Sequence, residues 1–147
     1  MAAQLKTTPA SRRLGLFAGA AALVVALDQL VKLWARASLV PGSPVTLIPH
    51  VMDLSLVYNT GAAFSMGEGH TAVFIGLAVV IVGAIVFGML AIKEHNALDV
   101  VALGLIAAGA VGNVIDRVAD GYVTDMICVT FIDFPVFNVA DICVVVG

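Results

Sequence analysis

The chain contains apolar runs that are long enough to cross a lipid bilayer. Residues 71–92 carry no charged side chain, residues 98–118 include a long apolar stretch before Asn113, and residues 14–38 begin with an uncharged stretch that ends at Asp28. A transmembrane helix needs about 20 predominantly apolar residues. Only 12% of the residues are charged and 61% are hydrophobic, which is too few charges to cover a soluble domain of this size. These runs predict a mainly α-helical membrane protein.

A fourth apolar stretch begins at Phe137 and reaches the end of the sequence at Gly147. It is too short to cross a hydrocarbon core, so we expect the sequence to stop inside its last span. The predicted fold is a single membrane domain, a four-transmembrane-helix bundle with an incomplete fourth span. The expected spans lie at about 14–38, 71–92, 98–118 and 137–147.

The first apolar run also has the features of a secretory signal peptide. Basic residues precede it, and Ala-Arg-Ala stands before Ser38, where a cleavage site could lie. Asp28, Lys32 and Arg36 nevertheless interrupt the run where a cleavage region should be small and neutral. We therefore favour a membrane span.

The basic residues of the short connections predict the orientation of the chain. Lys6, Arg12 and Arg13 precede the first span, and Lys93 lies between the second and the third. Basic connections stay in the cytoplasm. The tail 1–13 is therefore expected in the cytoplasm.

The segments 40–69 and 119–136 then lie on the extracytoplasmic side. Alternating apolar and polar residues at 45–48 and 54–58 predict that the first of these segments forms a small extracytoplasmic β platform.

Two aspartates stand at the edges of the apolar sequence, Asp125 in GYVTD and Asp141 in FNVAD. A carboxylate near lipid is costly and needs a reason. The short stretch between them could fold back and bring them together as a water-activating dyad, in which one ionised acid takes a proton from water and one protonated acid hydrogen-bonds the carbonyl. In the alternative interpretation, Asp141 caps the fourth helix and Asp125 is a turn residue. The residues alone leave both interpretations open.

Further polar residues lie near the same end of the predicted spans. Asn113 shares a helix face with Asp116 and Arg117, which either orient a substrate or tie the spans together; each of the two charged residues should find a partner elsewhere. Asp28 and Lys32 are four residues apart, and we expect this buried pair to fasten the first span to the platform rather than to act in catalysis.

Several other kinds of site are not indicated. The three histidines are scattered and have no metal-ligand spacing, so neither a metal site nor a cofactor is expected. Cys128 and Cys143 lack any paired motif and are expected to be free. The few basic residues form no dense patch, which argues against a nucleic-acid partner.

Taken together, five ordered motifs resemble the bacterial lipoprotein signal peptidase family, signal peptidase II. They cover nearly all of the chain after the basic tail. They are DQLVK at 28–32, YNTGAAFS at 58–65, AGAVGNVIDR at 108–117, GYVTD at 121–125 and FNVAD at 137–141.

The resemblance implies an aspartic endopeptidase of the inner membrane that removes signal peptides from diacylglyceryl-modified prolipoproteins, cutting just before the lipidated cysteine. Its partners would be these substrates and membrane lipids, it would need no cofactor, and we expect it to act as a monomer sensitive to globomycin. The catalytic pair falls on Asp125 and Asp141. The site-supporting residues fall on Asp28, Lys32, Asn59, Gly61, Asn113, Asp116, Arg117, Asn138 and Ala140.

Two features depart from the family pattern. Met126 follows the first catalytic aspartate where the family commonly has phenylalanine, which could change the packing beside the acid. The sequence ends at Gly147, whereas the family continues through its fourth span into a basic tail. Asp141 is therefore expected to be held less firmly.

Two other classes of protein could use acids near a membrane. A transporter would distribute its acids through the membrane depth and break its helices at midspan. A scaffold would use its polar residues only to join helices, so removing either acid would leave its function intact. The clustering of the polar residues at one end, together with the five motifs, disfavours both.

Overall fold

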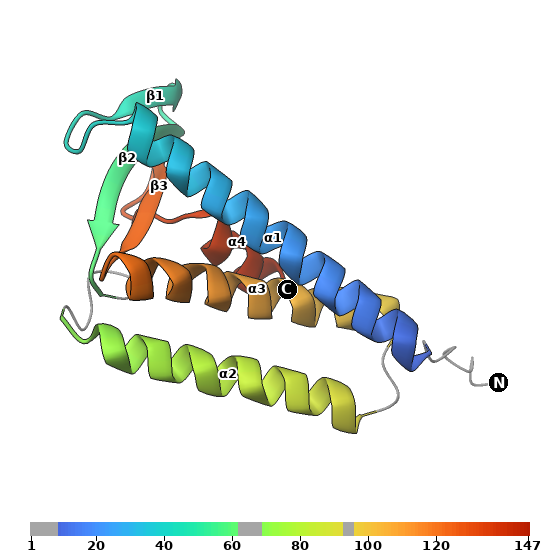
Figure 1. Ribbon diagram of the computed structural model, residues 1–147. Coiled ribbons are helices and arrows are strands. Elements are labelled where there is room, and N and C mark those ends of the chain that lie inside the picture. The colour runs from blue at the N-terminus through green and yellow to red at the C-terminus, as the bar shows by residue number, and fades with distance from the viewer. Residues whose placement is uncertain (1–8, 62–68, 93–95) are drawn as a thin grey trace.

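The fold was analysed in a computed structural model that describes residues 9–61, 69–92 and 96–147. The described residues form four helices and one small sheet (Figure 1). In order along the chain they are α1 (Ala10–Ser38), β1 (Val45–Ile48), β2 (Met52–Asn59), α2 (Thr71–Ala91), α3 (Ala97–Ala119), β3 (Val123–Val129) and α4 (Val139–Val146).

Within the described ranges, α1, α2 and α3 are long and apolar enough to cross a membrane, which confirms the first three predicted runs as helices of spanning length. The helix α2 exposes apolar side chains around its circumference and buries only Met89. Such a helix suits lipid rather than water. The helix α4 has 8 residues, less than a span requires. Lys6 and Lys93, on which part of the predicted orientation rested, lie outside the described residues, as do residues 62–65 of the second motif.

The helix α3 is the centre of the bundle because α1, α2 and α4 all pack against it, and α4 also contacts α1 (Figure 1). It begins with a capping box in which the Asn96 side chain accepts a hydrogen bond from the backbone N–H of Asp99 and the Asp99 side chain accepts one from that of Asn96. At the opposite end of α1 from the sheet, Arg13 donates to the carbonyl oxygen of Ile92, 2.9 Å away, and thereby ties α1 to the end of α2.

Two glycines let α3 approach its neighbours. A Cβ atom added at Gly109 would overlap the carbonyl oxygen of Ala140 and come within 2.6 Å of the Val144 side chain in α4. A Cβ atom at Gly112 would lie 2.6 Å from a carboxylate oxygen of Asp28 in α1. Only a residue without a side chain fits where the backbones come this close.

The sheet is antiparallel with the strand order β1-β2-β3, which confirms the predicted β platform as a small sheet. Strand β3 pairs with β2 so that Asp125 lies opposite Val57 and Val123 opposite Asn59. The sheet packs over the end of α1 through a buried apolar cluster of Ala35, Leu39, Leu56 and Met126. Met126 therefore packs toward α1.

After β3 the chain folds back, as the two flanking aspartates suggested. Ile127 and Phe137 form an isolated antiparallel bridge, with hydrogen bonds of 2.9 and 3.0 Å between their backbones. This bridge places the start of α4 beside the middle of β3 and so brings two segments separated in sequence to one place.

Replacing Gly109 with alanine should destabilise the protein, because the added methyl group would force α4 away from α3. We expect a loss of about 1–3 kcal/mol, seen as a lower thermal midpoint in detergent. The matched control is Gly83→Ala in α2, where nothing lies within 4 Å of the added atom; alanine's higher helix propensity should leave that variant unchanged or slightly more stable. Equal midpoints for the two variants would contradict this packing.

Candidate active site

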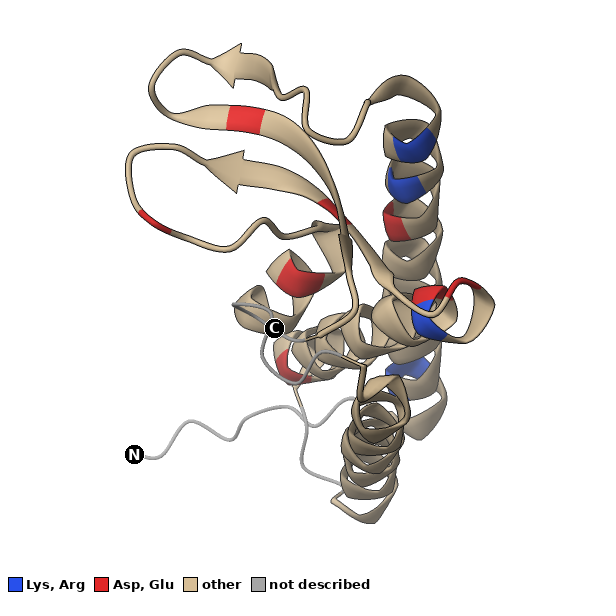
Figure 2. Cartoon of the chain, turned by 90° about the vertical axis from the view of Figure 1, so that its left-hand side faces the viewer, with Lys and Arg blue, Asp and Glu red and all other residues tan. Residues whose placement is uncertain are grey.

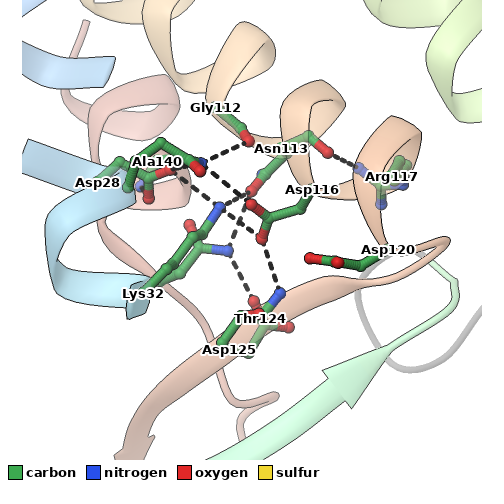
Figure 3. Close-up of polar contacts among 12 residues, drawn as sticks. Asp28, Lys32, Gly112, Asn113, Asp116, Arg117, Asp120, Thr124, Asp125 and Ala140 are labelled. Carbon is green, nitrogen blue, oxygen red and sulfur yellow. Dashed lines mark hydrogen bonds and ion pairs between the residues drawn. The ribbon is translucent and has the colours of Figure 1, made fainter. Parts of the chain in front are cut away.

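A buried ammonium group connects the helices at the end nearest the sheet. Lys32 is 1% exposed, and its Nζ lies 2.9 Å from the Asp28 carboxylate and 3.1 Å from that of Asp116. The same Nζ donates to the Asn113 side-chain oxygen at 3.0 Å (Figure 3). A charge in such a place is stable only when it is paired and hydrogen-bonded, and Lys32 meets both conditions.

The pair formed by Asp28 and Lys32 was expected to fasten the first span to the β platform. This expectation was wrong, because the pair connects α1 to the helices α3 and α4 instead. Lys32 contacts α3, and Asp28 accepts a hydrogen bond of 3.0 Å from the backbone N–H of Ala140 in α4. The physical reason is that Asp28 and Lys32 share the face of α1 that packs on α3 and α4. The pair is connected to the sheet only indirectly: Lys32 contacts Asp116, and Asp116 accepts a hydrogen bond of 2.9 Å from the backbone N–H of Thr124 in β3.

Asp125 is 2% exposed and is held from two sides. Its Oδ1 accepts a hydrogen bond of 2.6 Å from the Asn138 amide, and its Oδ2 accepts one of 3.0 Å from the Asn59 amide. Burial in a poorly solvated place raises the pKa of Asp125 to about 6, the bond from Asn59 lowers it, and the charge of Asp141 raises it. A carboxyl group with this pKa can carry a proton near neutral pH.

Asp141 belongs to the capping box of α4, although it is not the N-cap residue that the alternative interpretation made it. The N-cap residue is Asn138, whose side chain accepts from the backbone N–H of Asp141, while Asp141 accepts from the backbone N–H of Asn138 at 3.1 Å. Asp141 is therefore the third helical residue of a capping box and not the cap itself. Its other oxygen accepts a bond of 2.7 Å from the Asn113 amide. Asn138 thus contacts both aspartates.

The two aspartates open into one cavity of about 690 Å³. Asn59, Asn113 and Arg117 supply other polar groups of its wall, and the rest of the wall is apolar, with Phe134, Phe137, Ile142 and Val145 among its residues. Two carboxyl groups facing a mostly apolar hollow are suited to acid–base chemistry on an amphipathic chain. Among the residues that the structure describes, no group of three or more His, Cys, Asp or Glu side chains could hold a metal ion.

Arg117 and Gly61 meet beside this cavity. The Nη2 group of Arg117 donates a hydrogen bond to the Gly61 carbonyl oxygen, 2.8 Å from the nitrogen, and the guanidinium lies over the Phe74 ring of α2, 5.1 Å from its centroid. Asp116 points toward Lys32 instead. As predicted, these two adjacent residues have separate partners.

The predicted site residues therefore gather in one connected network at the sheet end of the bundle. The acids Asp28, Asp116, Asp125 and Asp141 all belong to it, and Ala140 joins it through its backbone. Figure 2 shows most charged positions of the described chain at this end. Sequence reasoning did not assign a role to Gln29, Arg36, Asp120 or Thr124, which also contact the network. The spacing of Arg36, four residues after Lys32, was a signal that could have found it.

Replacing Lys32 with methionine should destabilise the protein strongly, because the buried Asp28 carboxylate would lose its counter-charge and the buried Asp116 carboxylate would keep only Arg36, 3.4 Å away. The expected loss is about 3–5 kcal/mol in the free energy of unfolding. Thermal unfolding in detergent measures it, with Arg12→Met as the control, since Arg12 is an exposed cation on the same helix. A loss no larger than that of the control would contradict the role assigned to Lys32.

Comparisons with known proteins agree with this architecture. The sequence pattern of the signal peptidase (SPase) II family matches residues 20–147. A lipoprotein signal peptidase of Hydrogenovibrio crunogenus is 41% identical over 138 residues, which cover 86% of this chain and 77% of that protein. One from Deinococcus radiodurans is 42% identical over 136 residues, covering 85% of this chain and 71% of that protein.

Solved structures show the same fold. A bacterial membrane enzyme determined by the in meso method at 2.3 Å superposes with a TM-score of 0.85 and 33% sequence identity, over 90% of this chain and 82% of that one. A second, determined at 1.9 Å, gives a TM-score of 0.82 at 33% identity, over 90% and 87% of the two chains. The family match, the identities and the fold together show that this multi-pass membrane protein belongs to the signal peptidase II family of peptidases.

Proposed function

We propose that the protein removes signal peptides from diacylglyceryl-modified prolipoproteins, cutting just before the lipidated cysteine, and that Asp125 and Asp141 are its catalytic acids. The observation that carries the assignment of the acids is their convergence. They come from β3 and α4, they line one cavity, and Asn138 hydrogen-bonds both. Membership of a peptidase family argues against the transport and scaffold alternatives.

The proposed reaction needs one proton shared by the two acids. The ionised acid takes a proton from a water molecule, whose oxygen attacks the carbonyl carbon, while the protonated acid donates to the carbonyl oxygen. The C–N bond then breaks as the first acid gives the proton it took from water to the departing amine. The second acid takes back a proton from a hydroxyl group of the tetrahedral intermediate, so the pair again holds one proton. The raised pKa of Asp125 supports a pair with one ionised and one protonated acid, because a carboxyl group with a pKa of about 6 can hold the shared proton.

The supporting residues keep the acids in place. Asn59, Asn113 and Asn138 donate amide hydrogens to the two carboxylates. The group formed by Lys32, Asp28 and Asp116 fixes the helices that carry or contact these amides. Arg117 lines the cavity and donates a hydrogen bond to the Gly61 carbonyl oxygen. Ala140 anchors α4 through its backbone N–H.

The apolar wall suits the proposed substrate. Ile142, Val145 and Val146 of α4 and Phe134 and Phe137 before it line the cavity beside the acids. They could receive the apolar part of a signal peptide while the acyl chains of the lipidated cysteine stay in the bilayer. Anchoring the substrate in this way replaces diffusion with positioning at the scissile bond.

The topology we propose is that of four spans, of which α4 begins the last. The N-terminus lies in the cytoplasm of a bacterial inner membrane, and the sheet and the active site lie at the extracytoplasmic face. The arrangement is supported by Arg12 and Arg13 at one end of the bundle and by the sheet at the other. We propose a single membrane domain that acts as a monomer.

Asp125→Asn and Asp141→Asn should each abolish cleavage, because neither proton transfer can be completed with one carboxyl group. The assay follows the mass of a diacylglyceryl-modified prolipoprotein after incubation with the protein in detergent or lipid. The control is Asp133→Asn, which removes an exposed acid from the connection between β3 and α4 and should keep full activity. Globomycin should inhibit the parent protein. Cleavage by both active-site variants, with the lipidated cysteine as the new N-terminus, would overturn the assignment of the dyad.

The pKa of Asp125 also predicts how stability depends on pH. The folded protein holds this proton up to about pH 6, whereas the unfolded chain releases it near 3.8. The contribution of Asp125 to stability is therefore complete below pH 3.8 and is lost as the pH rises through 6, by about 3 kcal/mol in total. Thermal midpoints in detergent should thus fall from pH 4 to pH 7 in the parent relative to Asp125→Asn. Parallel curves for the two proteins would contradict the raised pKa.

A further inference from the structure

Arg36 lies in the last turn of α1 and joins three elements without touching either proposed catalytic acid. Its Nε–H donates to the Thr124 hydroxyl oxygen at 2.7 Å. One terminal nitrogen lies 2.7 Å from the Asp120 carboxylate and the other 3.4 Å from that of Asp116. The donors of the planar guanidinium have a fixed geometry, so the positions of these three partners relative to one another are restricted.

Thr124 is the neighbour of Asp125 in β3 and is fully buried. Successive side chains of a strand point to opposite faces, so Thr124 faces α1 while Asp125 faces the cavity. Asp116 holds the backbone N–H of Thr124 at 2.9 Å, and Arg36 holds its side chain (Figure 3 shows the backbone contact). Neither Arg36 nor Thr124 is among the described residues that line the cavity.

We propose that Arg36 is a positioning residue that fixes Asp125 through the Thr124 hydroxyl. We call the contacts of Arg36 with Thr124, Asp116 and Asp120 the Arg36 clamp. Asp120 is the C-cap residue of α3, so these contacts fix the end of α1 relative to the end of α3 and to strand β3. The inference rests on the proposed function, since it assumes that Asp125 acts on the substrate.

The clamp should affect the catalytic step more than substrate binding. A displacement of about 1 Å in a reacting group can cost about a hundredfold in rate. Asp125 keeps its bonds from Asn59 and Asn138 when the clamp is removed, so its displacement should be smaller and the loss partial. The apolar wall that would receive the substrate is formed by other residues.

The decisive comparison is between Thr124→Val and Thr124→Ser. Valine keeps the shape and the strand preference of threonine but removes the oxygen that Arg36 contacts, whereas serine keeps the oxygen and removes the methyl group. We expect valine to lower kcat about tenfold with KM changed by less than about twofold, and serine to keep kcat within about twofold of the parent. The control Thr46→Val, on the exposed strand β1, should keep the parent's kinetics.

Arg36→Gln should reproduce the effect of Thr124→Val, and the double variant should be no slower than the slower single variant, because both changes remove the same contact. Arg12→Gln, an exposed cation at the other end of α1, should have no effect. A role in packing alone predicts the reverse order, with serine the more damaging change. That order, independent additive losses in the double variant, or a kcat unchanged by valine would each overturn the proposal.

Asp125→Asn separates this inference from the proposed function. If Asp125→Asn is inactive and Thr124→Val retains the parent's kcat, only the role of Arg36 fails. If Asp125→Asn itself cleaves the prolipoprotein normally, the assignment of the acid fails, and the role of Arg36 fails with it.

Discussion

The arrangement of the bundle depends on one buried cation. The Lys32 ammonium, almost completely withdrawn from solvent, makes contacts of 2.9, 3.1 and 3.0 Å with Asp28, Asp116 and Asn113. Each of these partners also makes a hydrogen bond to another element. Asp28 accepts one from the backbone of α4, Asp116 accepts one from the backbone of β3, and Asn113 donates one to Asp141. Because unpaired charges are so costly in this environment, the four groups specify a single relative position for the helices.

The fit around this cation also requires closely approaching backbones. Gly112 leaves room for the Asp28 carboxylate, and Gly109 lets the start of α4 lie directly on α3. The polar groups and the glycines therefore depend on each other. A wider helix separation would break the hydrogen bonds, and without those bonds there would be little reason for small residues at these positions.

Much of this fold could be predicted from the sequence. Hydrophobic runs of spanning length identified α1, α2 and α3, and the alternation at 45–48 and 54–58 identified two strands, since both signals are local and periodic. The convergence of Asp125 and Asp141 was predicted as one of two interpretations. The resemblance to signal peptidase II, which the family match confirms, favoured it.

The parts that were not predicted are long-range contacts between side chains. The position of Asn138 as the cap of α4 depends on where the helix begins, and residue type alone does not decide it, because asparagine and aspartate are equally favoured at that position. The target of the pair formed by Asp28 and Lys32 depends on how α1 is rotated against its neighbours. The clamp of Arg36 on Thr124 joins residues 88 positions apart, for which a single sequence has no periodic signal.

The capping box of α4 has a consequence for how the chain can vary. The separation of Asn138 and Asp141 is at once the spacing that starts a helix and the spacing that presents an acid to the cavity. An inserted or deleted residue between them would turn Asp141 by about 100° around the helix, away from Asn113. The preceding residues 130–133 are exposed and do not line the cavity, so they carry no such restriction. Changes of length should therefore accumulate before the bridge at Phe137, and the interval from Phe137 to Asp141 should keep its length.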